Sequence, residues 1–546
     1  MRAWVIRGAF ALLLVVHVGV LLADPQFGPN DDYYLLDTVQ RGKWLPFTTF
    51  MGGGRFYPLN GWEYNLVAQI LPPTPGFYYL FNAVELVLFA LVFYLLLRRV
   101  NGSRALCFAL VALAITTYGF FQAWFRLLVP ERGEIFWFAV FLLAYLHFLD
   151  RPRWLVGVVA LVAANLALYH KEPGFLMLGG FGLGHLLLGW KASPVRVRVL
   201  DGLLVLSAAI YGTVYFALAG RGGANYAEIR GAQSLDQTFG YFLTWEPLLP
   251  LCLIPAVLLR AYQLLAAKRP LHPLYDPLLG AALVYVAVFF YLGITAQYYL
   301  LPTYVFALPA WLFYLDELRR IKASPLLPVG VAMGVGAAVY FAFADPANRF
   351  ASIFPNSLAQ INRLRYVPIN YNLALDYLVQ DIRRHPNRRA NIYLNTNRNS
   401  GFEAYLSFAR FLKSRGLSER QFDLRSDAPA DSRYNLSVVD PYSPYSVFRS
   451  PQATALTSGD YLVLLPTAFY GPLVEFRKDA LLADDDGPCD GRTTQDYRLL
   501  FRTGSPRTFP WNPWDLQAVW RWLRGEPQPW LNHCKRDLNY YVLMRR

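Results

Sequence analysis

Long apolar runs separated by short polar gaps fill the first 345 residues of the chain. About eleven of these runs approach the ~20 residues that a helix needs to cross the hydrocarbon of a bilayer. They lie near residues 4–22, 77–97, 105–122, 135–149, 154–169, 174–190, 200–218, 243–264, 277–293, 303–316 and 326–343. Several are short or contain proline, which interrupts a helix. The pattern predicts an α-helical polytopic membrane domain over residues 1–345, with about eleven transmembrane helices.

Basic residues gather in alternate gaps between these runs. The richer side includes Arg98, Arg99, Arg151, Arg153, Arg319 and Arg320. Cytoplasmic loops carry an excess of Lys and Arg, so this side is predicted to be cytoplasmic. An odd number of spans then places the N-terminus in the cytoplasm and the chain after about residue 344 outside. A signal peptide ending at Ala23 is the alternative for the first run, but the small-x-small cleavage pattern is absent.

The polarity of the chain changes after Asp345, where ordinary polar content begins. Short apolar runs typical of strands lie at 390–395, 435–440, 460–466 and 538–544, and helical periodicity lies between them at 401–414. We therefore predict a C-terminal extracytoplasmic α/β domain over residues 346–546.

Two of the four cysteines, Cys489 and Cys534, lie in this predicted outer domain. In an oxidising compartment they are candidates for a disulfide bond. The alternative is a pair of unpaired thiols, and the sequence alone does not decide between the two because the bond requires a specific geometry.

The composition supports the membrane interpretation, with 55% apolar residues and only 16% charged residues. Soluble domains average roughly 25% charged residues, so this chain is too apolar for one water-soluble core. The net charge is +14. Because 24 of the 51 Lys and Arg residues lie within the membrane half, where the excess of basic residues in cytoplasmic loops accounts for most of them, the charge does not predict nucleic-acid binding.

The first outer gap contains adjacent carboxylates, Asp31 and Asp32, followed by Tyr33 and Tyr34. A carboxylate close to aromatic rings and lipid has a raised proton affinity, which suits a general base. An equally plain interpretation is that the pair caps a short interfacial helix, since Asp is favoured at helix N-termini.

The second and third outer gaps add charge of both signs. The second contains Glu131 and Glu134, and the third contains Lys171 followed by Glu172. A lysine on the outer side runs against the charge bias, so an anionic ligand is one interpretation. A local ion pair with Glu172, or extension of the amine towards the headgroups, is the other.

Two further outer segments are candidates for ligand contacts. Arg55 follows three consecutive glycines, which allow a backbone to approach a ligand closely, although a flexible loop is the simpler interpretation. Tyr298 and Tyr299 lie in the fifth outer gap, where aromatic residues also form the interfacial belt of membrane proteins. No spacing of ligand residues predicts a zinc site.

Taken together, the Asp-bearing first outer loop, the Lys-Glu-x-Gly turn at Lys171–Gly174 and the Tyr-Leu-Leu-Pro sequence at 299–302 resemble the GT-C superfamily. These are polytopic glycosyltransferases that use polyprenyl-phosphate-linked sugars, including the protein O-mannosyltransferase and aminoarabinose-transferase branches. The resemblance covers roughly residues 1–345. It implies that Asp31 or Asp32 is the catalytic base and that Glu131 or Glu134 binds acceptor or a divalent metal ion such as Mg²⁺ or Mn²⁺.

The sequence departs from the family pattern at two points. Several branches have Asp-Glu where this chain has Asp-Asp, and an Arg often precedes Tyr-Leu-Leu-Pro where this chain has Gln297 and Tyr298. A phosphate contact at the latter position is therefore in doubt. Lys171, Arg55 or a divalent cation is expected to stabilise the departing phosphate. Because we find no second carboxylate placed as a nucleophile, a single displacement with inversion is expected.

These features predict a glycosyltransferase of the bacterial inner membrane. It is expected to transfer a sugar from a polyprenyl-phosphate donor to a lipid-linked glycan or a protein on the periplasmic face. The alternatives are a transporter or flippase, or a polymerase, of lipid-linked saccharides. A transport path calls for charged residues in the middle of spans, whereas the charges in this sequence gather at the outer ends, which favours chemistry at the interface.

Overall fold

The structure is a computed structural model, and it describes most of the 546 residues. The described residues are 3–29, 31–40, 42–47, 51–52, 55–218, 234–320, 326–346, 348–353, 356–394, 401–425, 456–465, 497–504, 517, 520–521, 524 and 539–546. The chain packs as two compact units, which are described separately. The first contains 1–23, 46–72 and 77–360, and the second contains 24–45, 73–76 and 361–546.

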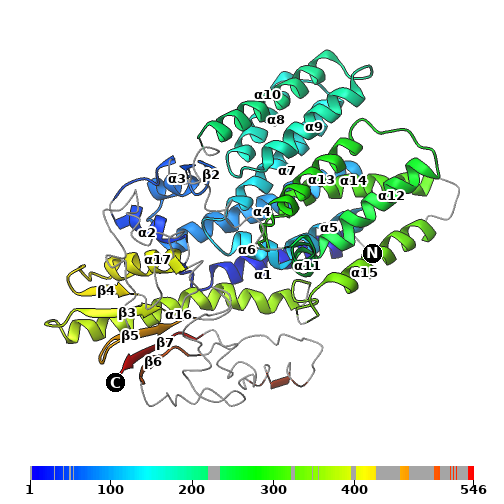
Figure 1. Cartoon of the computed structure of the whole chain (residues 1–546). Helices are drawn as coiled ribbons and strands as arrows, with labels where there is room; N and C mark the ends of the chain where they lie inside the picture. Colours follow the sequence, from blue (N-terminus) through cyan, green and yellow to red (C-terminus); the bar gives the residue numbers. More distant parts are fainter. Residues whose placement is uncertain are drawn as a thin grey trace. The chain divides into compact units, whose positions relative to one another are not determined.

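The first unit is a bundle of helices (Figure 1). Its helices are α1 (Ala3–Leu22), α3 (Glu63–Ile70), α4 (Pro75–Val100), α5 (Arg104–Ile115), α6 (Tyr118–Trp124), α7 (Pro130–Asp150), α8 (Trp154–Leu168), α9 (Gly174–Gly189), α10 (Val195–Leu218), α11 (Leu235–Trp245), α12 (Ile254–Leu265), α13 (Tyr275–Leu292), α14 (Leu301–Arg320) and α15 (Leu326–Phe343). Helix α7 packs against α8, α9 packs against both α10 and α13, and α13 packs against α14. The two-stranded hairpin of β1 (Met51–Gly52) and β2 (Arg55–Phe56) belongs to the same unit.

Every predicted apolar run is helical in the structure. Among the described residues, 6 helices are long and apolar enough to cross a membrane, or up to 8 if each bent helix pair is one span. Helices α8 and α9 are apolar but shorter. The helical class of the membrane half is therefore confirmed, and the number of about eleven spans stays a prediction.

Two spans are broken, and local sequence explains both breaks. Helices α5 and α6 meet at 67° around Thr116 and Thr117, and Thr117 accepts a hydrogen bond from Phe120 N at the start of α6. Helices α11 and α12 meet at 90°. There Pro247 and Pro250 lack the N–H groups that a continuous helix needs, and a short π-helix (Leu249–Leu253) joins the two arms.

The second unit contains a mixed five-stranded sheet, in the order β4-β3-β5-β7-β6. The strands are β3 (Ala390–Leu394), β4 (Phe422–Arg425), β5 (Tyr461–Leu464), β6 (Tyr497–Arg502) and β7 (Tyr541–Arg545). Strand β3 pairs in parallel with β4 and β5, and β7 pairs antiparallel with β5 and β6. The predicted strands at 390–395, 460–466 and 538–544 and the helix α17 (Gly401–Ser414) are confirmed, whereas 435–440 lies outside the described residues.

Two further helices belong wholly or partly to the second unit. Helix α2 (Tyr33–Gln40) belongs to the second unit, and the long helix α16 (Asn356–Arg384) begins in the first unit and continues into the second. The sequence predicted neither the helix α16 nor the strands β4 and β6. The proposed domain boundary between residues 345 and 346 stays a prediction. Cys489 and Cys534 lie outside the described residues, so the disulfide also stays a prediction.

Candidate functional site

Lys171 lies in the turn between α8 and α9 and is only 5% exposed. Its Nζ is 3.2 Å from Oε1 of Glu131. The same ammonium lies 5.2 Å from the ring centre of Tyr57 and 4.9 Å from that of Tyr299, close enough for cation–π attraction to both rings. Residues from three outer gaps therefore meet around one buried amine, together with Tyr57 from the first loop.

Glu134 extends this cluster by one helical turn. It accepts a 3.1 Å hydrogen bond from the hydroxyl of Tyr285 on α13. A Cβ on Gly174 would lie 2.7 Å from the other oxygen of Glu134, too close for a side chain. A side chain at Gly174 would therefore have to displace the Glu134 carboxylate, which occupies the space beside α9.

Glu172 connects the turn to the β1–β2 hairpin. Its Oε1 accepts a 3.1 Å hydrogen bond from the backbone N–H of Phe56, and the hydroxyl of Tyr211 donates to the carbonyl oxygen of the same residue. Arg55 precedes Phe56, and its guanidinium lies 5.5 Å from the ring centre of Tyr57. These bonds bring Arg55 into the electrostatic environment of Lys171.

The electrostatics of the turn fix the charge of Lys171. Burial lowers the pKa of Lys171, but the negative charge of Glu131, followed by Tyr299 and Glu172, raises it well above the ordinary value. Burial also lowers the pKa of the neighbouring His170, whose Nδ1 lies 2.9 Å from the carbonyl oxygen of Leu166. At neutral pH the turn therefore presents a cationic lysine beside a neutral imidazole.

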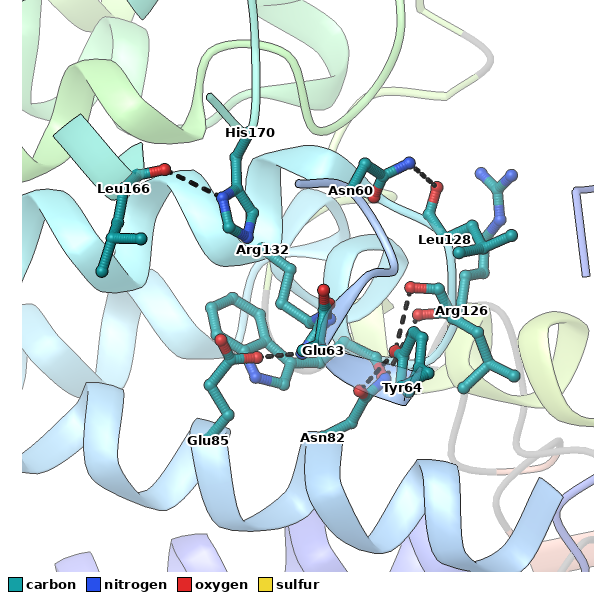
Figure 2. A network of polar contacts seen from close by, with 12 residues as sticks. Asn60, Glu63, Tyr64, Asn82, Glu85, Arg126, Leu128, Arg132, Leu166 and His170 are labelled. Carbon is teal, nitrogen blue, oxygen red and sulfur yellow. Dashed lines mark hydrogen bonds and ion pairs between the residues drawn. The ribbon is translucent and has the colours of Figure 1, made fainter. Parts of the chain in front are cut away.

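A second polar network lies beside this cluster (Figure 2). Arg132 is 1% exposed and forms ion pairs with Glu85 of α4 and Glu63 of α3. In the same network the hydroxyl of Tyr64 donates to Asn82 at 2.7 Å. The Asn82 side chain in turn donates to the carbonyl oxygens of Trp124, the last residue of α6, and of Arg126 in the loop that follows.

Of the two predicted tyrosines, Tyr299 contacts Lys171. Tyr298 instead lies with its ring centre 5.7 Å from the guanidinium of Arg126. Each ring of the fifth outer gap therefore faces a cation from a different gap. This placement is more specific than the interfacial belt that the sequence also allowed.

Asp31 and Asp32 belong to the second unit, so their geometry is described within that unit. Asp32 is 5% exposed, and its Oδ2 accepts a 2.6 Å hydrogen bond from the backbone N–H of Gly28. The carboxylate of Asp32 thus holds the turn that precedes α2. Asp31 is more exposed than Asp32.

The structure brings together Lys171, Glu131, Glu134, Glu172, Arg55 and Tyr299. The sequence did not identify the partners Tyr57, Tyr285, Glu63 and Glu85. Glu85 did leave a signal, because a carboxylate inside an apolar run needs a partner. Glu85 in α4 and Asp201 in α10 also correct the expectation that charges gather only at the outer ends of the spans.

The predicted Mg²⁺ or Mn²⁺ can be tested against the donor atoms. Carboxylate oxygens suit these hard cations, and within the described residues both oxygens of Glu131 and Oε1 of Glu134 make no hydrogen bond. However, the described part of the chain contains no group of three or more His, Cys, Asp or Glu side chains arranged to hold a metal ion. These residues therefore do not form a complete metal site, and no reaction step is assigned to a metal.

Comparison with known proteins adds a likeness of fold. No family model and no curated protein matches the chain. An oligosaccharyltransferase from Archaeoglobus fulgidus in complex with Zn and sulfate is 13% identical, with 98% of this chain and 88% of that chain covered and a TM-score of 0.41. ArnT from Cupriavidus metallidurans bound to undecaprenyl phosphate is 14% identical, with 86% and 94% covered and a TM-score of 0.38.

Proposed function

We propose that this protein is a membrane glycosyltransferase that transfers a sugar from a polyprenyl-phosphate donor to an acceptor hydroxyl at the outer face of the membrane. The observation that carries the proposal is the buried, cationic Lys171, held between two tyrosine rings and beside carboxylates at the ends of apolar helices. A buried ammonium close to a membrane surface suits the phosphate of a lipid headgroup.

The role of Lys171 is to stabilise the leaving group. When the bond between the anomeric carbon and the phosphate oxygen breaks, the phosphate keeps the electron pair and gains negative charge. A fixed ammonium stabilises this charge more in the transition state than in the ground state. Arg55, on the hairpin that Glu172 holds, supplies a second positive charge.

Asp31 is the base that we propose for the acceptor. The carboxylate of Asp32 is committed to the turn at Gly28, and Asp31 is the more exposed of the two. The acceptor gives its proton to Asp31, and its freed electron pair attacks the anomeric carbon on the side opposite the phosphate. The product therefore has the inverted anomeric configuration.

The setting that we propose is the periplasmic face of a bacterial inner membrane, with a lipid-linked glycan or a protein as the acceptor. A transporter is less well supported by the contacts within the spans. Glu85 is paired with Arg132, and Asp201 contacts both His185 and Tyr145. Mid-span charges that are paired in this way favour a role in helix packing over a transport path.

The test uses the full-length protein in lipid nanodiscs and undecaprenyl phosphate as the probe. We expect undecaprenyl phosphate to raise the melting temperature of the wild type and to have no effect on Lys171→Met. Sugar release from polyprenyl-phosphate sugars should fall about 100-fold or more in Lys171→Met. The exposed Lys191→Met is the matched control. Equal binding and equal transfer by both variants would contradict the proposal.

The two aspartates are tested in the same assay. Asp31→Asn should abolish transfer while undecaprenyl phosphate binding persists, because the base acts on the acceptor. Asp32→Asn should retain transfer in proportion to the folded protein that remains. Full activity in both variants would show that neither residue is the base.

A further inference from the structure

Residues of the first turn of α7 contact different neighbouring helices and turns. Glu131 faces Lys171, Arg132 binds Glu85 and Glu63, and Glu134 accepts from Tyr285. A Cβ on Gly133 would lie 1.9 Å from Cδ2 of His170, so the backbone of this turn packs directly against the imidazole. Because neighbouring helical residues are about 100° apart around the axis, these contacts together fix the rotation of the turn.

Arg132 makes the strongest of these contacts. Its guanidinium binds Glu85 through Nη1 and Glu63 through Nη2, as Figure 2 shows. The same group lies 5.4 Å from the ring centre of Tyr64 and 5.6 Å from that of Phe81. Arg132 therefore ties α7 to both α3 and α4, through a guanidinium and a Glu85 carboxylate that are buried and a Glu63 carboxylate that is partly buried.

We propose that Arg132 is a positioning residue, which holds the first turn of α7 in the rotation that keeps Glu131 against Lys171 without itself contacting the ligand. The proposal deepens the proposed function and rests on it for the role of Lys171. The structural part of the proposal is that Arg132 is coupled to Lys171 through one helical turn. This part does not depend on the reaction.

The chemistry of arginine suits this role. A guanidinium offers separate N–H groups in a rigid plane, so that it can bind a carboxylate on each of two helices. A lysine in its place keeps the charge but loses the fixed fork. Glutamine removes the charge and leaves the buried carboxylate of Glu85 and the partly buried carboxylate of Glu63 without their partner.

The charge environment of Lys171 provides a readout that requires no sugar substrate. The titratable groups that act on its ammonium are Glu131 and Glu134 of α7, Glu172 of its own turn, Tyr57, Tyr299 and Arg55. Only a deprotonated amine reacts with an acylating reagent. If Glu131 moves away, the pKa of Lys171 falls, and each unit of that fall increases the reactive fraction about tenfold.

The experiment treats the full-length protein in detergent with an N-hydroxysuccinimide ester and measures acylation of Lys171 by mass spectrometry. The exposed Lys191 and Lys268 serve as internal standards. We expect Arg132→Gln to raise the labelling of Lys171 about three- to tenfold relative to these standards, and Arg132→Lys to raise it less. Gly133→Ala should act in the same direction because it displaces His170.

Arg260→Gln is the matched control. Arg260 is also a buried arginine bound to a carboxylate, at 2.5 Å from Asp276. Its loss should leave Lys171 labelling unchanged. If Arg260→Gln raises Lys171 labelling as much as Arg132→Gln does, the effect is general loosening of the bundle and the positioning role is wrong.

The double variant Arg132→Gln/Glu85→Gln guards against misfolding, since it removes charges in a pair. Unchanged Lys171 labelling in any folded Arg132 variant that lacks the positive charge would overturn the proposal. Failure of the single, conservative and double variants to fold would assign Arg132 to stability alone and would also overturn it. If labelling responds but the wild type transfers no sugar, the coupling stands and the proposed function fails.

For the reaction itself, Arg132→Lys should lower kcat more than it raises KM, because Lys171 stays present but is less well placed in the transition state. A purely structural residue would lower the amount of active protein and leave both constants of the folded fraction unchanged.

Discussion

Two ion pairs in the helical unit each join a basic side chain to a carboxylate. They differ in how many hydrogen bonds their charged groups form. At the basic, predicted cytoplasmic ends of the helices, Arg260 binds both oxygens of Asp276, at 2.6 and 2.5 Å, and donates to the carbonyl oxygen of Pro270. The hydroxyl of Tyr314 also donates to Asp276. At the predicted outer ends, Lys171 meets Glu131 at 3.2 Å, and within the described residues neither Glu131 oxygen is in hydrogen-bonding geometry.

This difference separates a structural pair from a candidate site. A buried charge that is fully hydrogen-bonded contributes to a unique packing arrangement and has little capacity to bind anything else. A buried charge with unused bonding capacity is costly to keep unless a ligand or another function requires it. The Arg260 pair connects two helices, and the Lys171 cluster is the place where we propose that a ligand binds.

The largest expected effect comes from breaking the saturated pair. Asp276→Ala leaves the Arg260 guanidinium buried without its carboxylate and should lower the free energy of unfolding by about 3–5 kcal/mol. Denaturant unfolding in detergent measures this change. Asp316→Ala, which removes an exposed i,i+4 partner of Arg320, is the control and should cost less than about 1 kcal/mol. A similar decrease in the free energy of unfolding in both variants would show that the buried pair contributes no more than the exposed pair.

Ligand binding should stabilise the unsaturated cluster. Undecaprenyl phosphate at 100 times its dissociation constant should stabilise the wild type by about 2.7 kcal/mol. Arg260→Lys should keep this gain although its starting stability is lower. If stabilisation by undecaprenyl phosphate disappears in Arg260→Lys and persists in Lys171→Met, the Arg260 pair binds the ligand and the Lys171 cluster does not.

Gly174→Ala tests the space that the Glu134 carboxylate occupies. The new methyl group would lie 2.7 Å from that oxygen and should destabilise the protein by about 1–3 kcal/mol through overpacking. Gly180→Ala in the same helix meets nothing within 4 Å and should be neutral or slightly stabilising. Thermal unfolding of the two variants distinguishes these outcomes, and equal melting temperatures would contradict the close contact.

The smallest expected effect is the pH dependence from His170. Its pKa in the folded protein lies below the ordinary value because it is buried, so the unfolded chain binds the proton more tightly. The contribution of His170 to the free energy of unfolding should therefore fall as the pH decreases below about 6.5, by less than about 1.4 kcal/mol per pH unit. His170→Gln should flatten this part of the stability curve, and the same change at the exposed His147 should not.

Much of the fold could be predicted because apolar runs are local signals. The eleven runs near the predicted positions are all helical, and proline in 243–264 marked the bend between α11 and α12. The strand β4 was missed because its alternation of apolar and polar residues covers only four positions, and β6 was missed because its sequence does not alternate regularly. The helix α16 was missed as well, although its 29 residues make it the longest described helix.

The candidate site was predicted in its charged residues and missed in their partners. Lys171, Glu131 and Glu134 stand out because charges at the outer gaps run against the surrounding sequence. Tyr57 and Tyr285 do not stand out, since tyrosine is common in this chain and their roles depend on helices that pack from distant parts of the sequence. The pairing of Arg132 with Glu85 depends in the same way on the packing of α7 against its neighbours. The catalytic roles of all these residues remain proposals.

The backbone of Phe56 is held from both sides, by Glu172 at its N–H and by Tyr211 at its carbonyl oxygen. The strand that carries Arg55 is thus immobilised during folding, before any lipid arrives. Freezing a loop at the moment of association weakens affinity, and a loop that is already rigid avoids this entropic penalty. Under the proposed function, Arg55 on this pre-ordered strand would therefore bind a phosphate with a smaller loss of conformational entropy.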